Sequence, residues 1–180
     1  MIGTIDTSCA PDGENYKSIT GATLQIALNT GSMLTTCTRH TICADSSMSA
    51  ECIGCHLFVR RILPLRYFLK ELGFAQYHPT LICVDNLPVM NSLVGDIGAS
   101  VKSKYIIIRL KTINEAYING DIDFQHMSPS HIPSDMLSKL VPTTTHQYLR
   151  KFINGQTPLV TESTLSFSNE KKDDPAENFL

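Results

Sequence analysis

The chain has 180 residues, of which 42% are hydrophobic, and its formal net charge at pH 7 is −2. This length and composition are typical of one globular domain with a substantial core. The near-neutral charge excludes a binder that holds nucleic acid through a strongly basic surface over the whole chain. The first ten residues are polar, and no apolar run is long enough to cross a bilayer, so we expect an intracellular protein with no signal peptide and no membrane span.

The first third of the chain predicts three short strands. Residues 2–6 form the first, and "SITGATLQIAL" (18–28) and "GSMLTTCTRHTI" (31–42) alternate polar and apolar side chains as strands do. A turn at residues 29–31 joins the last two. Three sequential strands with short connections predict an antiparallel meander.

Residues 47–72 give the longest helical signal. Apolar side chains such as Cys55, Val59 and Ile62 recur at spacings of three and four, and Gly73 is a stop signal. Pro64 lies inside this segment, and it predicts a kink because proline removes one backbone hydrogen bond.

The rest of the chain alternates strands and helices. We expect strands at 80–85 and 121–127, a Pro-containing loop at 128–133, and helices at 87–93, from about 104 onward, at 134–140 and at 145–155. Helical crossovers make the later strands parallel to each other, so the whole pattern predicts an α/β fold with a mixed sheet.

One domain is expected over residues 1–157, followed by a disordered polar tail over 158–180. From residue 161 the tail holds five acidic and two basic residues and few large apolar groups, too few to form a core. Without it, the chain has 13 basic and 12 acidic residues, so any affinity for a polyanion must be local.

Four acidic residues lie at the ends or beginnings of predicted elements, and each has an ordinary structural interpretation. Asp6 closes the first strand and is a residue typical of turns. Glu51 and Asp135 lie near helix N-termini, where the helix dipole favours negative charge, and Asp85 stands where it would cap the helix that follows.

Together, the four acids favour a different interpretation. If the first strand lies beside the strand that ends at Asp85, the carboxylates of Asp6 and Asp85 emerge at one edge of the sheet. Glu51 and Asp135 would then approach from flanking helices. Clustered carboxylates repel one another unless a cation lies between them, and hard oxygen ligands suit Mg²⁺ or Mn²⁺.

Six motifs, in order, resemble the ribonuclease H domain of copia-type (Pseudoviridae) retrotransposon pol polyproteins, from Gly3 to about Gly155. The family's aspartate-bearing strand and Arg/Lys-Ser-Thr-Ser-Gly strand correspond to "TIDTSCAPDGENYKSITGA". Its Ser-Ser-Thr-Glu-Ala-Glu-Tyr helix start and Leu-Glu-Glu-Leu-Gly helix end correspond to "SSMSAEC" and "LKELG". Its Cys-Asp-Asn, Ser-Lys-His-Ile-Asp-Ile-Arg and Ala-Asp-Ile-Leu-Thr-Lys segments correspond to "VDN", "SKYIIIR" and "SDMLSK".

The resemblance implies a ribonuclease H-like fold with a five-stranded mixed sheet flanked by helices. It implies that Asp6, Glu51, Asp85 and Asp135 are catalytic carboxylates that bind two Mg²⁺ ions, with Mn²⁺ as a substitute. The implied reaction is two-metal hydrolysis of the RNA strand of an RNA–DNA hybrid. The implied partners are the hybrid and an upstream reverse transcriptase domain, and the implied location is the cytoplasm, in a virus-like particle, or the nucleus.

The chain departs from the family at four positions. Cys52 replaces an aromatic residue, Pro64 replaces a tryptophan, and Tyr105 and Ile107 replace a histidine and an aspartate. The chain also begins almost at the first catalytic strand. We therefore expect a fragment that lacks the reverse transcriptase, and the alternative function is a decayed or domesticated module that binds nucleic acid or protein without catalysis.

A competing pattern is "CIGCH", residues 52–56, which matches the site of covalent c-type haem attachment. Because the chain lacks an export signal and the motif lies within a predicted helix, we expect no haem. We interpret its cysteines as buried helical residues, and the six cysteines of the chain predict no disulfide framework. No second Cys or His pair follows at zinc-finger spacing.

Two further sets of residues are candidates for supporting roles. His131, in the loop before Asp135, is a candidate for proton transfer, and the alternative is an ordinary exposed histidine. A cluster of basic residues is a candidate for binding the phosphate backbone, and the alternative is a solvated helix face. This cluster consists of Lys102, Lys104, Arg109 and Lys111.

Overall fold

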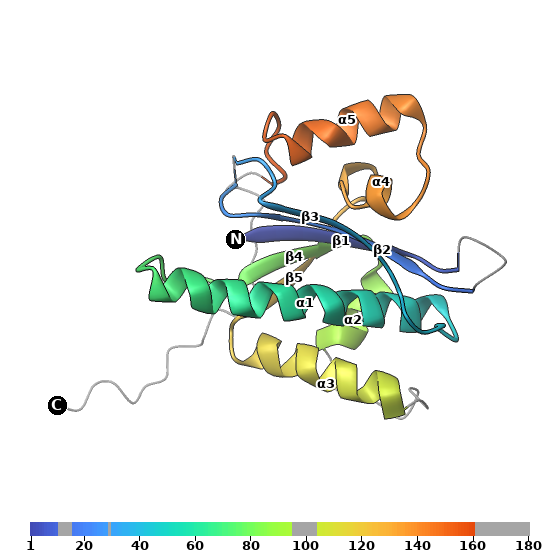
Figure 1. The fold of residues 1–180 in the computed structure, drawn as a ribbon, viewed down its shortest axis with the longest axis horizontal. Coiled ribbons are helices and arrows are strands. Elements are labelled where there is room, and N and C mark those ends of the chain that lie inside the picture. The colour runs from blue at the N-terminus through green and yellow to red at the C-terminus, as the bar shows by residue number, and fades with distance from the viewer. Residues whose placement is uncertain (11–15, 29, 95–103, 161–180) are drawn as a thin grey trace.

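The structure is a computed structural model that describes residues 1–10, 16–28, 30–94 and 104–160. Its centre is a five-stranded sheet with strand order β3-β2-β1-β4-β5 (Figure 1). The antiparallel meander is β1 (Ile2–Ser8), β2 (Ile19–Gln25) and β3 (Leu34–Arg39). The strands β4 (Thr80–Val84) and β5 (Ile122–His126) continue the sheet parallel to β1. The predicted mixed sheet is confirmed.

Helices cover both faces of the sheet (Figure 1). One face carries α1 (Ser47–Glu71), α2 (Leu87–Val94) and α3 (Lys104–Ile118). The other carries α4 (Asp135–Ser138) and α5 (Thr143–Ile153), after a 3₁₀ turn at Pro129–His131 in the predicted loop. Of the helices that the described residues form, none has the length and apolar character needed to cross a bilayer.

The alternation of side chains along β1 separates two cores. Ile5 packs with Phe58 of α1 in the larger core, whereas Ile2, on the opposite face, packs with Leu149 and Phe152 of α5. Both isoleucines are almost fully buried, and burial of such a side chain contributes about 1.5–3 kcal/mol. Strand β1 therefore packs against helices on both faces of the sheet, through Ile5 on one face and Ile2 on the other.

Helix α1 continues through Pro64, as the predicted helix over 47–72 does, and the predicted kink stays a prediction. Pro64 is exposed, so water can hydrogen-bond the carbonyl group that loses its partner. The structure differs from the sequence prediction at the end of the domain. Leu159 and Val160 are buried in the core beside α5 although the sequence placed them in the tail. Packing thus extends to residue 160, and the predicted tail from 161 lies outside the described residues.

Candidate active site

Strand pairing brings Asp6 and Asp85 to the same edge and face of the sheet. Thr4 of β1 pairs with Cys83 of β4, and each aspartate lies two residues further along its strand direction. Because side chains alternate with a period of two, both carboxylates lie on the face that α4 and α5 cover. The predicted proximity of these two acids therefore follows from the parallel β1–β4 register.

Gly21 allows α4 to approach Asp6. Gly21 pairs with Asp6 across the β1–β2 ladder. A Cβ atom on Gly21 would clash with the backbone oxygen of Ser134 and would lie 2.7 Å from Cβ of Leu137. The absence of a side chain thus lets the first turn of α4 lie against the sheet, and this contact brings Asp135 to the strand-end carboxylates.

We predict that Gly21→Ala destabilises the protein by about 1–3 kcal/mol, because α4 must move away from β2 to admit the methyl group. Urea unfolding would measure this change. Gly31→Ala is the matched control, since its Cβ would have 3.3 Å to the nearest atom, and we expect a change below about 1 kcal/mol. Equal stability of the Gly21→Ala variant and the wild type would contradict the close packing of α4.

Asp6, Asp85 and Asp135 form a three-carboxylate cluster. One oxygen atom from each lies within 4.8 Å of the others. Asp6 is buried and Asp135 nearly so, and Asp85 is half-buried. Carboxylate oxygens at this separation are the donors that Mg²⁺ and Mn²⁺ prefer, so the donor set fits the metal that the sequence predicts.

Ser138 of α4 and Lys139, which directly follows α4, contact this cluster, and sequence reasoning assigned neither. Nζ of Lys139 lies 2.9 Å from Oδ1 of Asp135 and 3.7 Å from Oδ2 of Asp6. The Ser138 hydroxyl donates a hydrogen bond to Oδ2 of Asp6. A signal for Lys139 was available, because a lysine four residues after an aspartate lies on the same helix face.

Glu51 lies on the opposite face of the sheet, and the group of carboxylates that meet within 4.8 Å in the described part of the chain does not include it. It lies in the second turn of α1, and the backbone and side chain of Thr7 act to lower the pKa of its carboxyl group. Burial, together with the negative charges of Asp6 and Asp85, raises the pKa of Glu51 from 4.5 to about 8. Glu51 is therefore electrostatically coupled to the cluster.

Asp85 and Asp135 show the same effect. Burial raises the pKa of Asp85, and the charge of Asp6 adds to the shift. Burial also raises the pKa of Asp135, although its hydrogen bond with Lys139 acts against this shift. Carboxyl groups whose pKa values are raised together form a site with an excess of negative charge, and a bound cation would relieve it.

Two of the ordinary structural interpretations are wrong. Asn86, not Asp85, caps α2, because its side-chain oxygen accepts the N–H of Val89 at 3.2 Å. Ser46 caps α1 by accepting the N–H of Ser49 at 3.2 Å, and the first turn of α1 contains no acid. Asp85 and Glu51 are thus not accounted for by helix capping or by a place in a first helical turn.

His131 and the basic cluster stay predictions. The His131 ring packs edge-on against Tyr148 and Phe152 of α5, at 5.9 and 6.3 Å between centroids, and Nδ1 is hydrogen-bonded to Ser130. The guanidinium of Arg109 stacks on Tyr105 at 3.3 Å from the ring centroid. Lys104 and Lys111 are exposed on α3, and Lys102 lies outside the described residues.

The cysteines of "CIGCH" lie in the core of α1. Cys52 and Cys55 are 1% and 2% exposed, as expected for buried helical residues. Burial raises the pKa of the Cys52 thiol to about 11, so this thiol is protonated at neutral pH. Both cysteine side chains are therefore inaccessible to a haem group approaching from solvent.

No family model matches the chain, and no curated protein matches it. Solved structures do match. LC11-RNase H1, isolated from compost by a metagenomic approach, is 14% identical with a TM-score of 0.51 over 71% of this chain and 84% of that chain. The same enzyme in complex with an RNA/DNA hybrid is 12% identical, with a TM-score of 0.50 over 71% and 85%.

The native prototype foamy virus protease-reverse transcriptase is also similar. It is 16% identical with a TM-score of 0.53, over 86% of this chain and 20% of that chain. At these identities the likeness establishes the fold alone. The chain has a ribonuclease H fold, as the sequence predicts.

Proposed function

We propose that the protein is a metal-dependent endonuclease that hydrolyses the RNA strand of RNA–DNA hybrids. The observation that carries this proposal is the three-carboxylate cluster of Asp6, Asp85 and Asp135 at the strand ends of a ribonuclease H fold. The coupling of Glu51 to the same charges supports a fourth carboxylate. A solved structure of similar fold was obtained in complex with an RNA/DNA hybrid.

The four acidic residues and His131 would have different roles in this reaction. Asp6, Asp85, Asp135 and Glu51 would hold two Mg²⁺ ions, with Mn²⁺ as a substitute. When bound, these ions would supply Lewis-acid activation of a water molecule and stabilisation of the leaving oxygen. The strands β1 and β4 fix two carboxylates rigidly, while α1 and α4 bring the other two from opposite faces. His131, in the exposed turn before α4, is proposed to assist proton transfer.

Substrate contacts are proposed for α3. Lys104 and Lys111 are exposed there and would contact phosphates, while Arg109 already stacks on Tyr105. Lys102 belongs to the same proposal. RNA would be distinguished from DNA through its 2′-hydroxyl groups, which line the wide minor groove of an A-like duplex.

We further propose that the chain derives from a copia-type retrotransposon polyprotein, in which a reverse transcriptase domain is the upstream partner. The six motifs in family order support this origin. Such a chain would act in the cytoplasm, inside a virus-like particle, or in the nucleus.

The test is cleavage of a labelled RNA–DNA hybrid in Mg²⁺ and in Mn²⁺ beside an Asp85→Asn variant. We expect the RNA strand to be cut only with a divalent cation, and the variant to lose this activity because one metal ligand becomes neutral. Circular dichroism of both proteins serves as the folding control. If the folded wild type cuts the hybrid in neither metal, the catalytic proposal fails and the non-catalytic module replaces it.

A further inference from the structure

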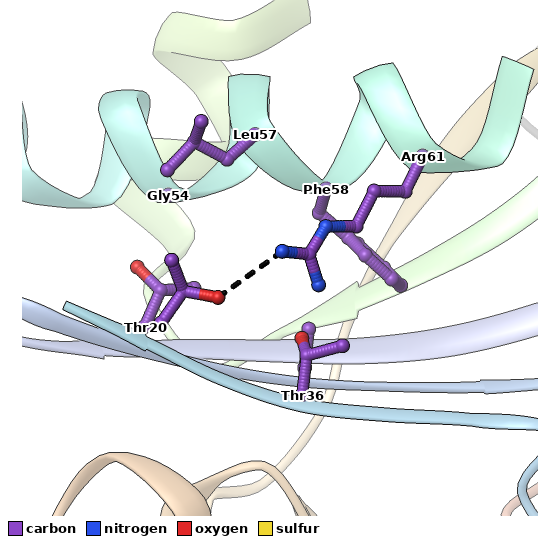
Figure 2. A pocket seen from close by; sticks show the side chains of 8 residues that line it. Thr20, Thr36, Gly54, Leu57, Phe58 and Arg61 are labelled. Atoms are coloured by element: carbon purple, nitrogen blue, oxygen red, sulfur yellow. Dashed lines mark hydrogen bonds between the residues drawn. The ribbon is translucent and has the colours of Figure 1, made fainter. Parts of the chain in front are cut away.

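Two pockets outside the carboxylate cluster differ greatly in size. The first lies between α1 and the sheet, where Figure 2 shows Thr20 below Gly54 and Arg61. Its volume is about 10 Å³, room for roughly one water molecule and for no organic ligand. A Cβ atom on Gly54 would clash with Oγ1 of Thr20, and this hydroxyl is hydrogen-bonded to Nε2 of His40 at 2.7 Å. The second pocket has a volume of about 350 Å³, within the range of small-molecule sites.

The larger pocket lies where α1 ends and the following loop leads into β4. Its lining includes Arg66, Tyr67, Lys70, Gln76, Tyr77 and Asp121, and we call it the tyrosine pocket. Arg66 contacts Thr80 at the start of β4, whereas Asp85 directly follows the end of this strand. Five residues of extended chain span about 17 Å, so the tyrosine pocket is well separated from the carboxylate cluster.

Arg66 builds the frame of the tyrosine pocket. Its guanidinium donates hydrogen bonds to the backbone carbonyls of Gln76 and His78, at 3.0 Å each. Its Nε lies 3.6 Å from Oδ1 of Asp121, so the charge of this acid is paired. The Arg66 side chain is only 11% exposed and therefore serves the protein rather than a ligand. The two carbonyl contacts hold the loop on both sides of Tyr77 and fix the position of its backbone.

Two exposed aromatic rings and an ammonium group remain for a ligand. Tyr67 and Tyr77 are 62% and 91% exposed, although both line the pocket. Tyr67 and Lys70 are three residues apart on α1 and so lie on the same helix face. In the described part of the chain no ion pair includes Lys70. Because the charges of Arg66 and Asp121 offset each other, the ammonium group of Lys70 gives the pocket a positive charge.

These groups fit a ligand that joins a flat ring to an anion. Exposed tyrosine faces stack on nucleobases of any sequence, and an ammonium group binds phosphate. An apolar peptide side chain fits less well, because such anchors need buried apolar surroundings and Ala75 is the remaining apolar residue of the lining. The volume lies at the lower end of the range for small-molecule sites, which limits the ligand to about one nucleotide.

We propose that the tyrosine pocket binds a nucleotide of single-stranded nucleic acid, with its base on Tyr67 and Tyr77 and its phosphate on Lys70. The proposal goes beyond the proposed function, because this surface is separate from the carboxylate cluster and needs no metal. In a hydrolase of the proposed kind, the pocket would hold a single-stranded extension of the hybrid.

The test is binding of a fluorescein-labelled thymidine decamer to the full chain, followed by fluorescence anisotropy in EDTA at several salt concentrations. EDTA removes the metal that the proposed hydrolysis needs, and the strand is DNA, so binding is measured apart from catalysis. We expect Tyr67→Ala and Tyr77→Ala each to weaken binding at least about fivefold. Lys70→Gln should weaken binding and reduce the slope of log affinity against log salt by about 0.7, the value for one phosphate of a single strand.

Matched controls substitute the same residue types elsewhere on the surface. Tyr16→Ala removes a tyrosine that is 66% exposed outside the pocket, and Lys151→Gln removes an exposed lysine of α5. Neither change should alter decamer binding or its salt dependence. Circular dichroism checks the fold of each variant. NMR backbone amide shifts on addition of unlabelled decamer should change at Lys70 and Tyr77, which locates the bound strand.

Four outcomes would overturn the proposal. The decamer could bind no more tightly than an abasic strand of the same length, so that base stacking contributes nothing. The control variants could lose as much affinity as the pocket variants. The NMR shift changes could be confined to α3. Finally, an acidic tyrosine-containing peptide could shift the pocket amides when the decamer does not, which would assign the pocket to a protein partner.

Failure of this proposal is distinguishable from failure of the proposed function. A protein that cleaves the RNA–DNA hybrid but binds no decamer at the tyrosine pocket would refute only the nucleotide site. A protein that binds the decamer there but cleaves no hybrid in either metal would support the nucleotide site and refute the proposed hydrolysis.

Discussion

Glu51→Gln is expected to raise the free energy of unfolding of the metal-free protein at pH 8 and to lower Mg²⁺-dependent hydrolysis by at least about 100-fold. The two effects share one cause. The carboxylate is unfavourable where it lies, because burial and the charges of Asp6 and Asp85 raise its pKa to about 8. A neutral amide removes this cost, and it also removes a ligand that the metal requires.

The sign of the pH dependence follows from the two pKa values. The pKa of Glu51 is about 8 in the folded state, against an ordinary value of 4.5 in the unfolded state. Between these values the folded protein binds more protons than the unfolded protein, so stability falls as pH rises. For one group the slope is about 1 kcal/mol per pH unit, and it diminishes near pH 8.

Other groups titrate in the same pH range. The quantity to measure is therefore the difference in unfolding free energy between the wild type and Glu51→Gln. Burial lowers the pKa values of His40, His56 and the Met1 amino group, and these groups act in the opposite sense. They are present in both proteins, and the wild type minus Glu51→Gln difference in urea unfolding isolates Glu51. We expect this difference to grow from pH 6.5 to 7.5 by about 1 kcal/mol in EDTA. A constant difference over that interval would mean that Glu51 is already ionised.

Mg²⁺ should reverse the decrease in stability that rising pH causes in the metal-free protein. A cation binds the deprotonated carboxylate and stabilises the folded state more as pH rises. The stabilisation of the wild type by Mg²⁺ should therefore increase with pH, and Glu51→Gln should lose most of this increase.

The fold and the convergence of two acids could be predicted because both depend on local patterns. Alternation identified the strands, and crossover lengths made β4 parallel to β1. Parallel neighbours end at one edge of a sheet, so Asp6 and Asp85 were expected to lie together, and they do. Whether they bind metal is a separate question that the cleavage and calorimetry experiments address.

The parts that could not be predicted depend on packing between distant segments. Nothing near Gly21 in the sequence shows that α4 will lie on it, and nothing near Thr20 shows that His40 will approach. Threonines in strands are ordinary, because branched side chains suit extended backbone. The glycine of α1 at position 54 gives a weak signal, since glycine inside a helix costs about 1 kcal/mol and calls for a packing reason.

Lys139→Met should produce two effects of opposite sign. The metal-free protein should lose about 1–2 kcal/mol of stability, because the lysine offsets the repulsion between Asp6 and Asp135. The affinity for Mn²⁺ should rise roughly tenfold, because the ammonium group and the metal compete for the same carboxylate oxygens. Lys139→Arg keeps the charge and should shift both quantities much less.

A loss of stability together with a gain in Mn²⁺ affinity would show that Lys139 competes with the metal, and would exclude a general disruption of α4. A variant that merely disorders α4 would weaken metal binding and stability together, since Asp135 lies in that helix. Urea unfolding in EDTA and calorimetry with Mn²⁺ measure the two quantities independently. Weaker Mn²⁺ binding by a folded Lys139→Met protein would show that the lysine supports the metal instead of competing with it. Tighter binding would mean that Lys139 occupies the position of a cation until the metal displaces it, and that its side chain, 42% exposed, can then move into solvent.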